Sequence, residues 1–403
     1  MRVLKSYLNS IGFIIPFILV GYLVNPFNMG FVFGYALVPL ILLKRNFLLK
    51  SMDLNFVLLL LLSFIYALFY MFDPVGGIQY AIFYAVFPPV FYLLGKFLIT
   101  ENIPQYTIYL LLFLIGFVFS FSALVSVILN FLEGGFSQLD RSLPMFWPGS
   151  GLVSATKMGG FFTLNMCIPA LLIGNQSKSK LIYKLIGIAI FIFSIVCVIR
   201  LGSRTQLGIM LITCFVSLIY VAPKQSFKKN VLLFLLISGI GFYIYSNVSF
   251  DLNEDWLSTF AGRMDKGAGD IASGGGRTER WIKSFEYMFE KPLGWSVNEF
   301  GFAHNLWLDV LRVTGIIPFI ILIIFSVRSF RTIKKTISFK SNQLYFSVQI
   351  LIYSIAFFML FMVEPIFDGM FEMFTIFCVF IGILCKYREV QHTPIFGTSI
   401  QQN

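Results

Sequence analysis

Long apolar segments recur along almost the whole chain, and short polar segments separate them. A helix that crosses a bilayer needs about 20 mostly apolar residues, and a chain inside the bilayer must satisfy its backbone hydrogen bonds internally. The pattern therefore predicts an all-α polytopic membrane protein. We expect twelve spanning helices, at residues 9–25, 27–43, 54–72, 78–95, 104–130, 155–174, 182–199, 205–222, 231–249, 305–327, 344–363 and 370–385.

One polar segment, residues 250–303, is much longer than the others. Loops between packed elements are usually short, so a long loop is commonly functional or disordered. This loop holds nine carboxylates, the arginines Arg263, Arg277 and Arg280, and the aromatic residues Trp256, Phe260, Trp281, Phe285 and Trp295. The aromatic side chains predict that the loop is folded. The expected organisation is helices over 1–249, the loop 250–303, three helices over 304–385 and a cytoplasmic tail, 386–403.

Composition and charge narrow the class of protein. The chain is 58% apolar and 12% charged, whereas soluble domains carry about 25% charged residues. The net charge of +11 does not indicate nucleic-acid binding, because most basic residues lie in short clusters between apolar segments. The two histidines exclude a histidine-rich metal site, and the five cysteines lie inside apolar segments without metal-ligand spacing. We therefore expect no metal site and inert cysteines.

The distribution of lysine and arginine predicts the orientation in the membrane. If both termini are cytoplasmic, the inner segments hold nineteen basic residues, and the outer segments apart from 250–303 hold only Arg141, Lys157, Arg200 and Arg204. Basic residues concentrate on the cytoplasmic side of membrane proteins. The loop is therefore expected at the outer face, which in a bacterium is the periplasmic side of the inner membrane. The N-terminal segment lacks a small-x-small cleavage site, so we expect an uncleaved first span.

Ionisable residues in or beside the expected spans gather near the outer face. Charged groups are costly in a membrane and often mark functional sites. The residues concerned are Arg200, Arg204, Asp309, Arg312, Glu364, Asp368 and Glu372. We therefore expect a site at the outer membrane boundary, covered by the loop 250–303.

Structural roles are the alternative for the arginines of this group. Arg200 and Arg204 are also placed to extend toward the headgroups of outer-leaflet lipids. Asp309 and Arg312 are three residues apart near the start of an expected helix, and this spacing predicts an ion pair between them.

Structural roles are also expected for the carboxylates. Those in the turn between the last two spans are expected as partners of arginines: Glu364, Asp368 and Glu372. A second acidic group is expected on a solvated face, with a base or a divalent-metal ligand as the alternative: Asp251, Glu254 and Asp255.

Two arginines are placed to bind an anion. The glycines at 274–276 free the backbone to present Arg277, and Thr278 is expected to cap the following helix. Arg204 opens an expected helix, where an anion is already favoured. Because a planar guanidinium matches the oxygens of a diphosphate, both arginines are candidate diphosphate ligands. The alternative for Arg277 is a surface ion pair with a neighbour such as Glu279.

His304 is the candidate for proton transfer. It lies where the loop meets the expected helix 305–327, at the boundary between water and membrane. A neutral imidazole at this position can accept a proton near pH 7. The alternative is a helix-capping residue without a chemical role.

Short motifs follow one another in a definite order over residues 203–318. They are Ser-Arg (Ser203, Arg204), Gly-Arg-x-x-x-Trp (Gly276, Arg277, Trp281), Pro-x-Gly (Pro292, Gly294) and His-Asn with a later glycine (His304, Asn305, Gly315). With the twelve expected spans and the long outer loop, this order resembles the bacterial O-antigen ligase and O-antigen polymerase superfamily. Arg312 departs from the pattern, because relatives often carry a carboxylate before the glycine.

The resemblance implies a helical fold of the lipid-dependent (GT-C-like) glycosyltransferase kind and an enzyme that needs no metal or other cofactor. Its donor would be an oligosaccharide linked to undecaprenyl diphosphate. The resemblance assigns the diphosphate to Arg204, Arg277 and Arg280. It implies that Arg277 and His304 are catalytic, with His304 taking the proton of the attacking hydroxyl. The supporting residues would be Asn305, Asp309 and Arg312.

The acceptor separates the two activities of this superfamily. A polymerase uses the undecaprenyl-diphosphate-linked oligosaccharide as donor and acceptor, with a chain-length regulator as a further partner, whereas a ligase transfers the glycan to lipid A-core. The richness in Phe, Ile, Lys and Asn suggests the AT-rich coding of surface-polysaccharide gene clusters and favours a polymerase. The alternative of another class is a transporter or flippase. Transporter sites usually lie near the bilayer midplane between repeats, and this chain has no evident internal repeat.

Overall fold

The computed structural model describes residues 7, 9–101, 103–136, 142–174, 181–249, 251, 254–259 and 276–392. The α-helices of these ranges are α2 (Ile14–Val24), α3 (Gly30–Leu42), α4 (Arg45–Ser51), α5 (Leu54–Tyr70), α6 (Tyr80–Phe97), α7 (Gln105–Gly134), α8 (Ala155–Gly160), α9 (Ile168–Gly174), α10 (Leu181–Arg200), α11 (Arg204–Val221), α12 (Phe227–Asn247), α15 (Arg277–Glu290), α16 (Leu306–Thr314), α17 (Ile316–Ile337), α18 (Leu344–Val363), α19 (Ile366–Gly369) and α20 (Phe371–His392). The short 3-10 helices are η1 (Pro26–Asn28), η2 (Asn165–Cys167), η3 (Ala222–Lys224) and η4 (Asp255–Leu257). The strands β1 (Ser142–Pro144) and β2 (Leu152–Ser154) form an antiparallel hairpin in which Leu143 pairs with Val153.

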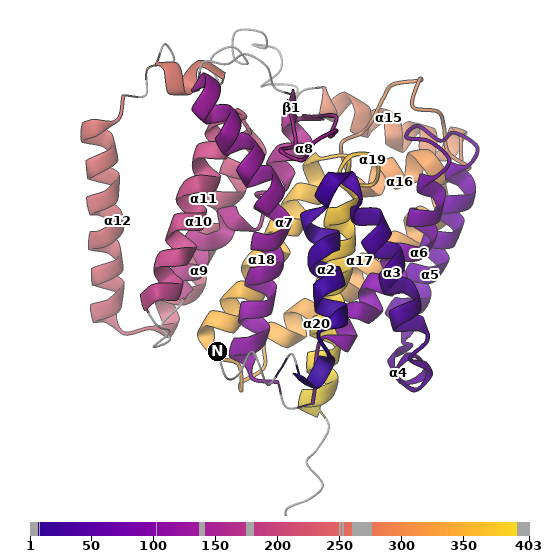
Figure 1. Ribbon diagram of the computed structural model, residues 1–403, viewed down its shortest axis with the longest axis horizontal. Coiled ribbons are helices and arrows are strands. Elements are labelled where there is room, and N and C mark those ends of the chain that lie inside the picture. The colour runs from indigo at the N-terminus through magenta and orange to yellow at the C-terminus, as the bar shows by residue number, and fades with distance from the viewer. Residues whose placement is uncertain are drawn as a thin grey trace, which may run out of the picture.

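Long apolar helices dominate the fold. Within the described ranges, the helices long and apolar enough to cross a membrane are α6, α7, α10, α11, α12, α17 and α18, and the bent pair of α3 and α4 adds an eighth if it is one span. None of the residues of α12 is buried, and this helix stands apart from the others in Figure 1. A helix that is apolar on all sides belongs in a core or in a bilayer. The prediction of an all-α polytopic membrane protein is confirmed.

Several expected spans contain short, bent or broken helices. The segment 27–43 leads into α4 through a bend of 88°. Over 155–174 the chain forms α8, a turn, η2 and α9 instead of one helix. The helices α2 and α5 are apolar but shorter than the seven spanning candidates. Helices occur within each of these segments, but the apolar pattern did not show where they begin, bend and end.

The expected helix 305–327 is also broken, and a tertiary contact explains the break. Helix α16 ends at Thr314 and α17 begins at Ile316, because Gly315 between them adopts a φ of 73°. A Cβ atom on Gly315 would lie 2.0 Å from the carbonyl oxygen of Pro292. The same oxygen accepts a hydrogen bond from the N–H of Ile316 at 2.9 Å. The loop before α16 thus packs directly on the break between the two helices.

Helices α6 and α20 pack closely through glycine. A Cβ atom on Gly95 would lie 2.1 Å from the carbonyl oxygen of Val379, and a Cβ atom on Gly382 would lie 2.1 Å from that of Tyr92. Small residues allow helix backbones to approach each other in membrane proteins. These two glycines therefore allow the backbones of α6 and α20 to come into direct contact.

The last helix is longer than the sequence suggested. We placed the end of the last span at residue 385, but α20 continues to His392. Lys96, which is 1% exposed, lies 2.6 Å from a carboxylate oxygen of Glu389 and 2.9 Å from one of Asp53. These ion pairs hold the extension of α20 against α5 and α6. The remainder of the expected tail, 393–403, lies outside the described residues.

Helix α6 connects two different ends of the bundle. Near its C-terminal end, the carbonyl of Leu98 accepts a hydrogen bond from the hydroxyl of Tyr7 at 2.6 Å, and Lys96 contacts the end of α20. Near its N-terminal end, the hydroxyl of Tyr84 donates to the carbonyl of Phe367 in α19 at 2.9 Å. At about 1.5 Å per residue, Tyr84 and Lys96 are about 18 Å apart along the helix. Figure 1 shows α15, α16 and α19 close together in the upper part of the view, and the hydrogen bond of Tyr84 to α19 brings the N-terminal end of α6 to them.

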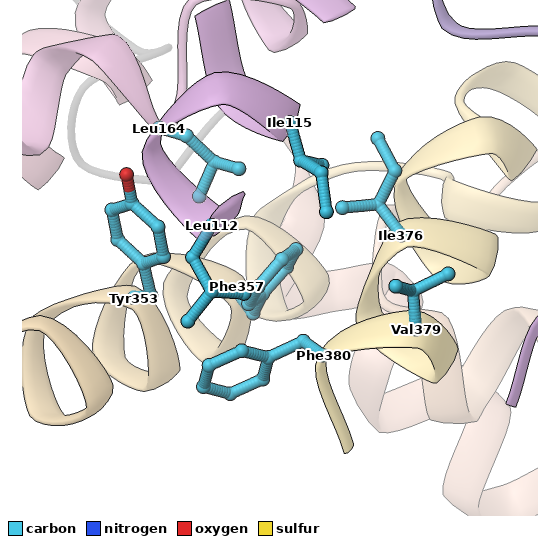
Figure 2. A pocket seen from close by; sticks show the side chains of 8 residues that line it. All are labelled: Leu112, Ile115, Leu164, Tyr353, Phe357, Ile376, Val379 and Phe380. Atoms are coloured by element: carbon cyan, nitrogen blue, oxygen red, sulfur yellow. The ribbon is translucent and has the colours of Figure 1, made fainter. Parts of the chain in front are cut away.

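A small gap remains in the apolar core. Figure 2 shows its lining, which comes from α7, α18, α20 and the segment before η2: Leu112, Ile115, Leu164, Tyr353, Phe357, Ile376, Val379 and Phe380. The gap has a volume of about 10 Å³, which is at the lower limit for one water molecule. It is a packing gap and not a binding site.

Candidate functional site

The candidate site lies where the starts of α11 and α15 meet the end of α18. The hydroxyl of Thr205 donates a hydrogen bond to Oε1 of Glu364 at 3.0 Å, and Nη2 of Arg277 lies 3.9 Å from the same oxygen. Glu364 is buried, with 4% of its surface exposed. One carboxylate therefore links the helix that begins with Arg204 to the helix that begins with Arg277. The two arginines expected to bind a diphosphate stand at the start of these two helices.

Helix α15 begins differently from the expectation. We expected Thr278 to cap the helix, but Gly276 is the N-cap residue, with a φ of 74°. Glycine adopts this left-handed conformation without steric cost, so the helix starts at Arg277 and Thr278 falls in its first turn. Arg277 pairs with Glu364 across the site, and the expected alternative partner, Glu279, pairs instead with Lys283 at 3.1 Å.

The described part of the loop is folded, as the aromatic residues predicted. Trp281 on α15 packs against a small apolar cluster built on Trp295, Ala303, Leu308 and Leu311. Two other aromatic residues of the loop are not seen in this cluster. Phe285 is 52% exposed, and Phe260 lies outside the described residues, as does Arg263.

Two side chains of α15 hold the backbone that leads into His304. Nη1 of Arg280 donates to the carbonyl oxygen of Phe302 at 3.0 Å, and Nε1 of Trp281 donates to that of Ala303 at 2.9 Å. Arg280 was predicted as a diphosphate ligand. In the structure it lies beside His304 and uses part of its guanidinium to support the backbone, a contact that the sequence did not indicate.

Asp309 holds the backbone on both sides of His304. Its Oδ1 accepts a hydrogen bond from the N–H of Ala303 at 2.8 Å, and its Oδ2 accepts one from the N–H of Asn305 at 3.1 Å. His304 itself has a φ of 54°, a conformation that is uncommon for a residue with a side chain and is often found at functional sites. Asn305 is the N-cap of α16, and its side chain accepts the N–H groups of Trp307 and Leu308. His304 therefore precedes the cap, so the alternative of a capping role for His304 is wrong.

The predicted ion pair between Asp309 and Arg312 is wrong. Asp309 lies in the first turn of α16, where its carboxylate accepts the backbone N–H groups just described. Arg312 lies one turn further on and contacts α19 instead, with its Nη2 3.0 Å from Oδ2 of Asp368. Both side chains of this pair are buried, at 2% and 5% exposure. Arg312 was expected to support the site. In the structure it holds α19, which lies between α18 and α20, through its ion pair with Asp368.

The imidazole of His304 is kept neutral by its surroundings. Burial lowers its pKa first, the nearby guanidinium groups of Arg277 and Arg280 lower it further, and the resulting pKa is about 4. Its Nδ1 atom is buried and has no hydrogen-bond partner among the described residues. At neutral pH the ring can therefore accept a proton. An anion bound to the arginines would oppose their effect and make the ring a stronger base.

The remaining charged residues have mixed outcomes. Arg200 does not extend to lipid headgroups, because it is 1% exposed and its Nη2 donates to Asn130 on α7 at 2.8 Å. Glu364 and Asp368 have arginine partners, as predicted, but Glu372 lies 3.9 Å from a lysine, Lys157.

Across the described ranges, no group of three His, Cys, Asp or Glu residues is arranged to hold a metal ion. The acidic residues expected on a solvated face are exposed: Asp251, Glu254 and Asp255.

Sequence reasoning missed two contacts near the site: Thr205 binds Glu364, and Lys157 lies beside Glu372. Asp309 was expected as a supporting residue, but not with the backbone on both sides of His304 as its partner. The position of Thr205 next to Arg204 at a helix start was a weak signal. No local pattern relates Lys157 to α20, since the contact joins distant parts of the chain.

Comparison with known protein families and with curated proteins finds no match to this chain. The resemblance to the O-antigen ligase and polymerase superfamily therefore rests only on the order of the motifs over residues 203–318. The function has to be argued from the site itself.

Proposed function

We propose that this protein is a polymerase of O-antigen or of a related surface polysaccharide. It joins repeat units linked to undecaprenyl diphosphate at the periplasmic face of the bacterial inner membrane. The observation that carries the proposal is the meeting of Arg277 and the start of α11 on Glu364, beside the neutral His304. Guanidinium groups bind diphosphate oxygens, and a neutral imidazole removes the proton of a hydroxyl group.

In the proposed reaction, a hydroxyl of the acceptor sugar attacks the anomeric carbon of the donor sugar. The new carbon–oxygen bond forms while the bond from the anomeric carbon to the diphosphate oxygen breaks. The hydroxyl proton passes to the imidazole of His304, and the electron pair of the broken bond leaves with undecaprenyl diphosphate. Arg204 and Arg277 stabilise the negative charge that develops on this leaving group. Because the charge grows toward the transition state, the arginines stabilise that state more than the bound substrate.

Twelve membrane crossings with both termini in the cytoplasm are part of the proposal. Its support is the position of basic residues at the end of α6 that lies away from the site. Lys44 lies over the ring of Phe97 at 4.9 Å, and Lys96 lies one residue before that ring. Basic residues concentrate on the cytoplasmic side, so the site would face the periplasm. A lipid-linked donor could then keep its tail in the bilayer while its diphosphate reaches the site.

Cysteine labelling tests this orientation. Asn298 is exposed in the loop before α16, and Ser341 is exposed between α17 and α18. In cells with a permeabilised outer membrane, a membrane-impermeant maleimide is expected to label Asn298→Cys but not Ser341→Cys. Breaking the inner membrane should expose Ser341→Cys, and the parental protein measures the background from native cysteines. Labelling of Asn298→Cys only after the inner membrane is broken would contradict the orientation.

Reconstitution tests the activity. The purified protein in proteoliposomes, supplied with undecaprenyl-diphosphate-linked repeat units, is expected to produce a ladder of longer lipid-linked glycans. If product forms only when lipid A-core is added, and the glycan is found attached to it, the protein would instead be a ligase. Movement of the lipid-linked unit across the bilayer without elongation would identify a flippase and refute the proposal.

A further inference from the structure

A long apolar groove begins two residues after His304. It lies between α16, α17, α18 and α20 and has a volume of about 380 Å³. Leu306 and Trp307 line it beside the site, and on α17 its lining runs from Leu322 to Ile337. At about 1.5 Å per residue, this part of α17 is about 22 Å long. A space of this length and volume is narrow, so it fits a linear chain better than a compact ligand.

The groove is lined for a hydrocarbon. Most of its walls are Leu, Ile and Phe side chains. Three of the four serines in the lining already donate to carbonyl groups of the preceding turn: Ser326 to Leu322 at 2.8 Å, Ser338 to Lys334 at 2.8 Å and Ser354 to Ile350 at 2.6 Å. The hydroxyl of the fourth, Ser329, is buried without a partner among the described residues, and Lys334 is the one charged residue of the lining. The three paired hydroxyl groups need no partner from a ligand. The small serine side chains leave room between the larger apolar ones.

The groove is continuous with the candidate site. Nε1 of Trp307 donates to Ser326 at 3.0 Å, which ties the start of α16 to the groove wall on α17. The side chain of Asn305, adjacent to His304, contacts Met362 near the end of α18 at 3.6 Å. Glu364, which pairs with Arg277, follows two residues later. The mouth of the groove is thus formed by α16 and α18, which adjoin His304 and Glu364, and Glu364 in turn pairs with Arg277 of α15.

We infer that this groove binds the polyprenyl tail of the lipid diphosphate whose head group occupies the site, an inference that rests on the proposed function. The diphosphate lies near Arg277 and His304, and the isoprenoid chain passes Trp307 and runs along α17 between α18 and α20. A single long isoprenoid chain joined to a doubly charged head matches a narrow apolar groove whose mouth adjoins His304 and the Glu364 carboxylate that pairs with Arg277. A bulk phospholipid has two tails and a single phosphate, and it matches this arrangement less well.

Filling the groove tests the inference. Ser354→Phe places a ring in the groove from α18, and Ile324→Phe is the matched control, because Ile324 is 45% exposed on α17 and does not line the groove. The rate is measured with two donors that carry the same glycan on an undecaprenyl or on a farnesyl chain. Ser354→Phe is expected to lower kcat/KM for the undecaprenyl donor by about tenfold, since it displaces about two methylene groups or more from apolar contact. The farnesyl donor, and both donors with Ile324→Phe, should keep their parental kcat/KM.

Two outcomes separate failure of the inference from failure of the proposed function. An unchanged ratio of the two donors in Ser354→Phe would overturn the groove assignment, even if the protein is active. If the parental protein used neither donor, the proposed function would fail, and crosslinking would decide the groove. A benzophenone amino acid in place of Phe358, which lines the groove and is 57% exposed, should capture labelled undecaprenyl diphosphate. Equal competition by phosphatidylglycerol would overturn the inference, and competition by unlabelled undecaprenyl diphosphate alone would support it.

Discussion

His304→Ala is expected to lower turnover by about 10²–10⁴-fold, the usual contribution of a general base. Donor binding should change little, because the diphosphate is held by the arginines and not by the imidazole. The reason for this expectation is the neutral imidazole, which lies beside the guanidinium groups of Arg277 and Arg280. His392→Ala, which changes the other histidine in the sequence, is the control and should keep parental activity. A parental rate in His304→Ala would remove the histidine from the chemistry.

The pH dependence gives an independent check on His304. Its pKa in the free protein is lowered to about 4 from an ordinary value of 6.5, so the neutral base persists well below pH 6. The value of kcat/KM, which reports the free enzyme, is therefore expected to fall only as the pH drops through about 4. A bound diphosphate opposes the effect of Arg277 and Arg280 and should move the acid limb of kcat to higher pH. An acid limb of kcat/KM near 6.5 would contradict this assignment.

A chelator and a second variant distinguish the base from its rivals. Activity is expected to survive EDTA, since the proposed mechanism uses no metal. Asp309→Asn keeps the shape of the side chain that holds Ala303 and Asn305 but removes its charge. Asp309→Asn should lower turnover, because His304 is then held less precisely. The amount of lipid-linked donor that the protein binds should stay unchanged. Loss of activity with EDTA that magnesium restores would move the chemistry to the carboxylates of the loop.

Arg277→Ala and Arg204→Ala are each expected to abolish detectable polymer. Removing one preorganised group that stabilises developing charge typically costs about 10²–10³-fold in kcat. Lysine at either position should restore activity only in part, because the ammonium group lacks the planar pair of donors. The rates are to be compared at equal abundance of folded protein in the membrane. Normal polymer yield and length in both alanine variants would exclude these arginines from the site.

Neighbouring positions provide the controls for the arginine variants. Lys283→Ala removes an exposed basic residue of the same helix, α15, whose partner is Glu279, and it should leave polymer formation unchanged. Glu364→Gln keeps an oxygen for the hydroxyl of Thr205 but loses the charge beside Arg277. We expect it to weaken donor binding less than Arg277→Ala does. A loss as large as that of Arg277→Ala would point to Glu364 itself as a reacting group.

The sequence predicted the class of fold because membrane insertion depends on local composition. Apolar segments such as 104–130 and 344–363 became the long helices α7 and α18, since every backbone group of a spanning segment must be paired within its own helix. The same reasoning placed helical segments at 155–174 and 305–327 but missed their breaks. Those breaks depend on contacts such as the one between Gly315 and Pro292, which local composition does not encode.

By itself the sequence determined which residue types are present at the site, and tertiary structure decided which of them contact each other. Spacing along a helix predicted that Arg312 would pair with Asp309, yet Arg312 pairs with Asp368 and Asp309 holds the backbone around His304. The outcome follows from burial. Once α16 packs against α19 and the loop, each buried charge and each buried N–H must find a partner within reach, and the partners within reach are set by the packing of helices that are distant in sequence.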